Sequence, residues 1–179
     1  HTVDRHMVET VLHASALTRM VHRPDLLLFA ALFHDIGKGS QEDHSERGAR
    51  LIGPIAARVG FDTADQETLK ILVEQHLLLS ATATRRDLDD PVTIASVLAL
   101  IPDLETLELL HALSIADGEA TGSAGWSDWK ATLVSDLVKR VKKAMSGSST
   151  IAAQPEITPD QLKVAESGVL QVNLEHREN

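Results

Sequence analysis

Apolar residues recur three or four positions apart along most of the chain, which is the spacing of one face of an α-helix. Leu, Ala, Val and Ile fill most of these positions, and strand-like alternation of apolar and polar residues is scarce before residue 145. The pattern therefore predicts an all-α bundle. The expected helices span residues 2–20, 25–35, 43–59, 63–79, 91–100, 104–119 and 127–145.

Residues with strong preferences at helix ends support these boundaries. Pro91 suits a first helical turn, where its missing N–H group is not needed, and Asp103 is typical of an N-cap. Gly60 is expected directly after a helix. Inside the third helix, Pro54 is expected to bend or break the chain. The polar run 81–90 is expected to form a loop.

The character of the chain changes after Met145. Small and polar residues predominate from Ser146 to Pro159, a composition typical of a flexible linker. Residues 169–174 alternate between apolar and polar, which predicts a short edge strand. We therefore expect a helical domain over residues 1–145. Residues 146–179 are expected to be a linker that leads towards a further domain.

Composition excludes several classes of function. Lys and Arg number 17 and Asp and Glu 26, so the net charge is −9, which argues against a nucleic-acid partner. The absence of Cys excludes thiolate-ligated metal sites and disulfide scaffolds. The apolar runs are far shorter than the ~20 residues of a membrane span, and the chain shows no export signal. We expect a cytoplasmic protein without a membrane partner.

Histidine is the feature that composition leaves unexplained, because the chain contains nine. Several of them, together with aspartates, stand at the ends of the predicted helices. Imidazole and carboxylate groups are ligands for divalent metals, and unpaired His and Asp beside Leu and Ala would be costly without a shared partner. The residues concerned are His6, His34, Asp35, His44, His76 and Asp117.

Each of these residues alone is weak support for a metal site. A single His is more often solvated or hydrogen-bonded within the protein than bound to a metal. The order His, His-Asp, His, His, Asp, in apolar surroundings each time, is more informative. Ligands so far apart in sequence converge only if several helices pack together, so the bundle itself would have to build the site.

The order of these residues resembles the signature of the HD-domain metal-dependent phosphohydrolases. Further segments resemble the HD region of the bacterial PII uridylyltransferase/uridylyl-removing enzyme family, and this similarity covers about residues 1–145. The segments that carry it are Thr2-Val3-Asp4-Arg5-His6, Ala30–Gly39, Asp43-His44-Ser45, Gln75–Leu78, Thr82–Asp87 and Trp126–Lys130.

The resemblance implies an HD-domain helical bundle that binds one or two divalent ions, with Mn²⁺, Mg²⁺, Fe²⁺ and Zn²⁺ all open. It implies a first ion held by His6, His34, Asp35 and Asp117. It implies a second ion held by Asp35, His44 and His76, with Asp35 bridging the two. Since a His ligand must be neutral, we expect occupancy to fall below about pH 6.5.

The resemblance also implies a reaction and a partner. The expected activity is hydrolysis of a protein-linked phosphodiester, which removes UMP or AMP from a tyrosine of the PII nitrogen-signalling protein. The nucleotidyltransferase part of that family has no counterpart in these residues, so this chain is expected only to remove nucleotides. Residues 146–179 are expected to lead towards the regulatory ACT domains of that family.

Three basic residues are candidates for contacts to the substrate. Asp35 and Lys38 are the candidate catalytic residues. Lys38 lies on a Gly-flanked loop four residues past His34, and its ammonium suits a phosphate. Arg85 and Arg86 are candidates for binding phosphate or nucleotide, although ordinary surface ion pairs would also explain them. Two other functions stay open: hydrolysis of a free nucleotide, and an inactive metal-binding module that only transmits regulation.

Overall fold

The computed structural model describes residues 2–123 and 125–151, and within them the chain forms helices and no strands. The expected all-α fold is thus confirmed for this part. The possible strand at 169–174 lies outside the described residues. The helices are α1 Val3–Ala16, the 3₁₀ turn η1 Thr18–Met20, α2 Pro24–Phe33, α3 His44–Val59, α4 Thr63–Glu74, α5 Leu78–Arg85, α6 Pro91–Leu98, α7 Leu104–Thr121 and α8 Asp128–Ile151.

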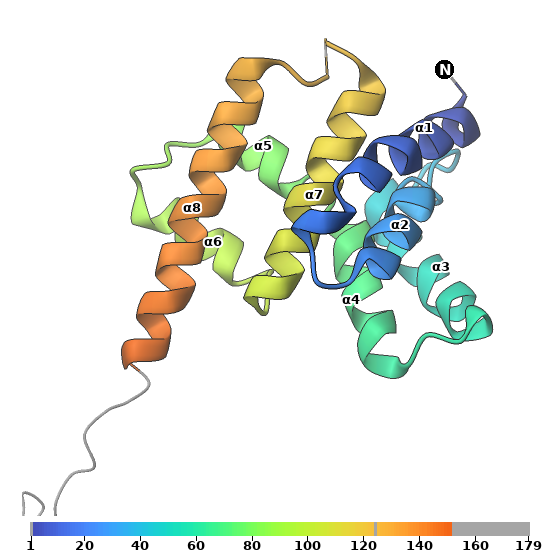
Figure 1. The fold of residues 1–179 in the computed structure, drawn as a ribbon, viewed down its shortest axis with the longest axis horizontal. Helices are drawn as coiled ribbons and strands as arrows, with labels where there is room; N and C mark the ends of the chain where they lie inside the picture. The colour runs from blue at the N-terminus through green and yellow to red at the C-terminus, as the bar shows by residue number, and fades with distance from the viewer. Residues whose placement is uncertain (1, 124, 152–179) are drawn as a thin grey trace, which may run out of the picture. The chain divides into compact units, whose positions relative to one another are not determined.

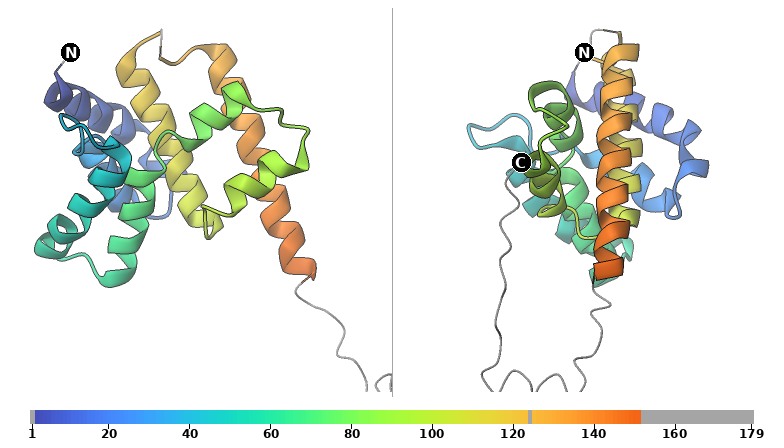
Figure 2. Two further views of the ribbon diagram at one scale, coloured as in Figure 1. Left: turned by 180° about the vertical axis from the view of Figure 1, so that it is seen from behind. Right: turned by 90° about the vertical axis from the view of Figure 1, so that its left-hand side faces the viewer.

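Helix α7 lies at the centre of the bundle (Figure 1). It contacts α1, α2, α4 and α5, and α8 lies alongside it in both views of Figure 2. Buried residues occur all round α7, which is typical of a helix enclosed by others. They are Thr106, Leu107, Leu109, Leu110, Ala112, Leu113, Ser114, Ala116, Gly118 and Ala120.

The end signals read from the sequence are used as expected at three helices. The carboxylate of Asp103 accepts from the backbone N–H of Thr106 at 2.7 Å and so caps α7. Gly60 ends α3 with a φ of 108°, a left-handed conformation that favours glycine. Pro91 is the first residue of α6. These signals depend only on neighbouring residues, which is why sequence alone identifies them.

Pro54, which was expected to bend or break the third helix, does not break it. Helix α3 continues through it from His44 to Val59. Pro54 and Arg50, whose carbonyl loses its helical partner, are both exposed, so water can satisfy that carbonyl. Ile52 and Ala56, on either side of Pro54, are fully buried and hold both halves of the helix against the core.

Three further boundaries differ from the prediction. The expected helix 63–79 is two helices, because α4 ends at Glu74 and α5 begins at Leu78. The first half of the expected loop 81–90 belongs to α5, whose Thr82 and Ala83 are buried. Helix α8 continues six residues beyond the predicted end at Met145. Within the described residues, every helix is too short or too polar to cross a bilayer.

Candidate metal centre

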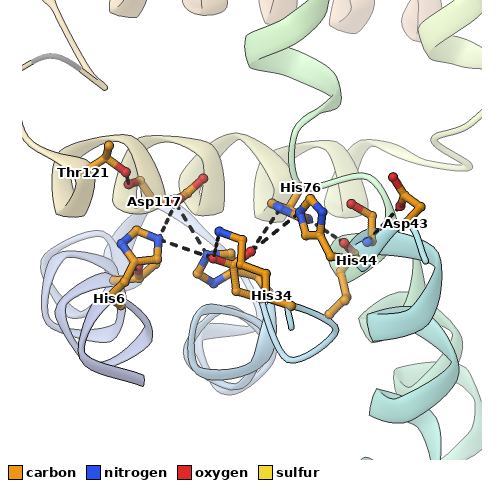
Figure 3. Close-up of polar contacts among 12 residues, drawn as sticks. His6, His34, Asp43, His44, His76, Asp117 and Thr121 are labelled. Carbon is orange, nitrogen blue, oxygen red and sulfur yellow. Dashed lines mark hydrogen bonds and ion pairs between the residues drawn. The ribbon is translucent and has the colours of Figure 1, made fainter. Parts of the chain in front are cut away.

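The six His and Asp residues singled out above converge on one site (Figure 3). His6 lies on α1 and Asp117 on α7, the central helix. The other four stand at helix ends, as the sequence indicated. His34 and Asp35 directly follow α2, His44 is the first residue of α3, and His76 lies in the turn between α4 and α5. Packing of five helices therefore assembles the site.

His6, His34 and Asp117 form a group that we call the first cluster. One ligand atom from each lies within 4.8 Å of the others. The Nε2 atom of His6 is 2.8 Å from Oδ1 of Asp117, and Nε2 of His34 is 3.5 Å from the same oxygen. Three candidate metal-ligand atoms thus lie close together, and the ring of His34 is fully buried.

Asp35, His44 and His76 form the second cluster, which meets the same 4.8 Å limit. The Oδ1 atom of Asp35 lies 3.7 Å from Nε2 of His44 and 3.7 Å from Nε2 of His76. Its Oδ2 atom instead lies 3.5 Å from Nε2 of His34 and 3.8 Å from Nε2 of His6. One carboxylate therefore has an oxygen directed to each cluster, which is the arrangement of a bridging ligand.

Backbone carbonyls orient two of the rings. Nδ1 of His34 donates to the carbonyl of Ala31 at 2.9 Å, and Nδ1 of His76 donates to the carbonyl of Val73 at 2.7 Å. A carbonyl only accepts, so the proton of each neutral ring is on Nδ1 and the lone pair of Nε2 faces the site. Hydrogen bonds of this kind orient His ligands in metal sites.

Two buried atoms of the site have no hydrogen-bond partner, Nε2 of His34 and Oδ1 of Asp35. Buried polar atoms are costly when unpaired. At the second cluster, moreover, the lone pair of His76 and the negative Oδ1 of Asp35 face each other, and both are acceptors. A cation between them resolves the conflict. The residues present therefore fit divalent metal, with nitrogen and oxygen donors only.

The pKa values of the buried histidines differ between the two clusters. Burial would lower the pKa of His34, but contacts with Asp117 and Asp35 outweigh it and raise the pKa to about 9. Burial lowers the pKa of His76 to about 4, although its hydrogen bond to Val73 opposes the shift. The pKa values of both rings therefore lie away from the ordinary value near 6.5 on which the expected loss of metal occupancy rests, because of burial and neighbouring charge.

The aspartates of the site are ionised. Burial would raise the pKa of Asp35, yet His34 and Lys38 hold it well below its usual value. Asp117 behaves in the same way, with burial outweighed by the neighbouring His34. Two carboxylates and four imidazoles thus offer a cation a site with a formal charge of −2 when the rings are neutral.

Comparison with known proteins decides the family. Residues 3–121 match the HD domain family, and this range contains all six residues of the site. The chain belongs to the HD domain family. HD domains bind divalent metals, and the two clusters are groups that could hold them.

Several curated relatives of this HD domain share one name. The chain is 56% identical over 155 residues, 87% of its length, to the bifunctional uridylyltransferase/uridylyl-removing enzyme of Streptomyces coelicolor. It is 52% identical over 178 residues, 99% of its length, to the enzyme of that name from Mycobacterium tuberculosis. The chain spans about a fifth of these relatives, 18% and 22% of their lengths. The relatives' name supports a hydrolase-type role.

Lys38 contacts the centre of the HD domain site directly. Its Nζ atom lies 2.5 Å from Oδ2 of Asp35, and its side chain is 41% exposed. The spacing of Lys38 in the sequence indicated a position near the site but not this ion pair. An open pocket of about 270 Å³ begins here. Its lining residues are Thr2, Val3, His6, Asp35, Lys38, Ala120 and Thr121.

Arg85 and Arg86 lie further away along the chain. Arg85 ends α5, the helix that begins two residues after His76, and both arginine side chains are exposed. Eight residues of helix span about 12 Å. Their part in substrate binding therefore stays a prediction.

Sequence reasoning missed the acceptors that orient the rings, the carbonyls of Ala31 and Val73. A signal was present, because His34 and His76 each stand three residues after the acceptor, at the end of an apolar helix.

Proposed function

We propose that this HD domain is a metal-dependent phosphodiesterase that removes a nucleotidyl group from a tyrosine of the PII nitrogen-signalling protein. It would act as the hydrolase part of a bifunctional uridylyltransferase/uridylyl-removing enzyme. UMP is the expected group, because the relatives are named for uridylyl removal. The observation that carries the proposal is the carboxylate of Asp35, which faces two three-residue clusters at once.

The residues present suit this chemistry. Divalent ions bound at the two clusters would supply a Lewis acid for the phosphodiester and an activated water for in-line attack. Metal ligands in the proposal are His6, His34, Asp117 and the shared Asp35 on one side, and Asp35, His44 and His76 on the other. Mn²⁺, Fe²⁺ and Zn²⁺ bind such nitrogen and oxygen donors, and Mg²⁺, which prefers oxygen, is the fourth candidate.

Lys38 would neutralise charge on the substrate. Its ammonium already lies against the shared carboxylate and lines the open pocket, so a phosphate that enters there meets a positive charge. Arg85 and Arg86 would contact the nucleotide or its carrier further along α5.

The proposed leaving group needs little general-acid assistance from the protein. A nucleotidylated tyrosine releases a phenolate, whose conjugate acid has a pKa of about 10, far below that of a sugar hydroxyl. Strong general-acid assistance is therefore not required, which agrees with a site whose two carboxylates are ionised.

The test is release of nucleotide from modified PII. The chain is incubated with Mn²⁺ and PII-UMP, PII-AMP or free nucleotides, and the mass of PII is followed. We expect loss of UMP from PII, with activity abolished in His6→Ala and retained in His13→Ala. His13 is a matched control on the same helix, since it pairs at 3.0 Å with Glu119 and belongs to neither cluster.

Other outcomes would contradict the proposal in distinct ways. Turnover of free nucleotides without turnover of modified PII would support a nucleotide phosphohydrolase. Bound metal without turnover of any of these substrates would support a regulatory module.

A further inference from the structure

Two glycines lie where the segments that carry the second cluster meet. Gly37 is in the turn just after Asp35, and Gly48 lies one turn after His44 on α3. A Cβ atom added to Gly37 would lie 2.0 Å from the carbonyl oxygen of His44 and 2.7 Å from the backbone nitrogen of Gly48. These are backbone atoms, so they cannot rotate away. The turn thus packs directly on the backbone of α3.

Gly48 on α3 lies in turn close to α4. A Cβ atom added there would lie 2.7 Å from Cγ1 of Val73 on α4. Val73 is fully buried, and its carbonyl is the acceptor that orients the ring of His76. The absence of side chains at Gly37 and Gly48 therefore lets the turn, α3 and α4 stack at close range, each beside its own ligand of the second cluster.

We infer that Gly37 and Gly48 are positioning residues for the second metal ion, an inference that rests on the metal centre of the proposed function. Non-bonded atoms sit about 3.5 to 4.0 Å apart, so a methyl group on either glycine displaces a segment by about 1 Å or more. Metal–ligand distances tolerate only about 0.2 Å. The second cluster is therefore the part of the site that such a methyl group disrupts.

The first cluster has a different support. His6 and Asp117 lie on α1 and α7, neither of which carries these glycines, and the ring of His34 is held by Ala31 of α2. Substitution of Gly48 should consequently leave the first ion in place. Gly37 is closer to the shared Asp35, so its substitution is the less selective of the two.

Gly53 provides a matched control on the same helix. A Cβ atom added there would lie 2.8 Å from Cε of Lys70, again on α4. That atom is the far end of a flexible side chain that is 38% exposed, so it can move aside. Gly53→Ala and Gly48→Ala share the same helix and the same gain in helix propensity, and they differ in what the methyl group meets.

The experiment counts ions per chain after equilibrium dialysis against Mn²⁺, with helix content checked by circular dichroism. We expect two ions in wild type and in Gly53→Ala, and one in Gly37→Ala and Gly48→Ala, with the second ion bound about 10- to 100-fold more weakly. Removing the obstructing methyl groups should restore it, so Gly48→Ala/Val73→Ala should again hold two ions. Gly37→Ala/Val73→Ala should still hold one, because its obstruction is backbone.

Two results would overturn the inference. Two ions of unchanged affinity in Gly37→Ala and Gly48→Ala would overturn it and leave the proposed function standing. Fewer than two ions in the wild-type chain would also overturn it, and the absence of any bound ion would in addition overturn the proposed function. If Gly48→Ala does not fold, the Val73 double variant decides, since two ions there support the close packing and one ion contradicts it.

Discussion

The two clusters of the site use the same residue types but are built differently. The first draws on residues up to 111 positions apart, with His6 and Asp117 on the faces of two long helices that pack against each other. The second draws on Asp35, His44 and His76, all at helix ends and held by turns and backbone contacts. The packing of two long helices positions His6 and Asp117 of the first cluster, and close contacts between turns and helix ends position the second.

Their electrostatics differ as well. His34 faces two carboxylates and has a pKa of about 9, whereas His76 has a pKa of about 4 because it is buried beside a positively charged neighbour. A proton and a metal ion therefore compete at His34 near neutral pH and do not compete at His76. Similar ligand sets can thus lose their protons, and gain affinity for a metal ion, over different pH ranges.

Removal of the shared carboxylate should have the largest effect, because Asp35 is the one proposed ligand directed to both clusters. We expect Asp35→Asn to lower phosphodiesterase activity by about 10³-fold or more and to weaken both ions. Activity and bound Mn²⁺ are measured on the same preparation. Asp136→Asn is the control, since Asp136 is 49% exposed and pairs only with Lys139 among the described residues. Loss of one ion alone would show that Asp35 does not bridge.

Removal of one imidazole from each cluster should separate the two ions. We expect His6→Ala and His76→Ala each to keep one ion and to bind the other at least about 100-fold more weakly. Metal content per chain measures this, with His13→Ala as the control that keeps both. If either variant lost both ions, the clusters would have to be one cooperative site.

The pH dependence should sharpen the comparison further. An ion reaches the first cluster only after a proton leaves His34, so its affinity should rise about tenfold per pH unit from about pH 7 and level off above about pH 9. Titration of His76→Ala with Mn²⁺ isolates this ion. An affinity that stays constant between about pH 7 and 9 would contradict the raised pKa of His34.

Removal of the ammonium beside Asp35 should have the smallest effect on binding. Lys38 competes with a metal ion for Oδ2 of Asp35, but its side chain is 41% exposed and its charge is screened by water. We expect Lys38→Met to bind the first ion about threefold more tightly while turnover of modified PII falls. Calorimetry and the PII assay measure the two effects. Weaker binding of the ion would show that Lys38 supports the site instead.

Much of the fold could be predicted from the sequence because helix periodicity and end signals are local. Asp103 and Gly60 act as expected, and all six proposed ligands converge. Pro54 does not break α3 because Ile52 and Ala56 on either side of it are buried against the core, which apolar spacing alone does not show. The split between α4 and α5 was missed because apolar spacing continues across it.

The division of the site into two clusters could be expected only from family resemblance. It depends on which way each oxygen of Asp35 points, and no residue pattern encodes that direction. The opposite pKa shifts of His34 and His76 depend in the same way on neighbours brought together by folding. Chemistry that arises from long-range packing needs the structure.

The central claim is that one carboxylate serves two ions. An anomalous scattering map of crystals grown with Mn²⁺ tests it most directly. We predict two peaks, one among His6, His34 and Asp117 and one beside His44 and His76, each next to a different oxygen of Asp35. A single peak, or two peaks of which one does not contact Asp35, would contradict the account.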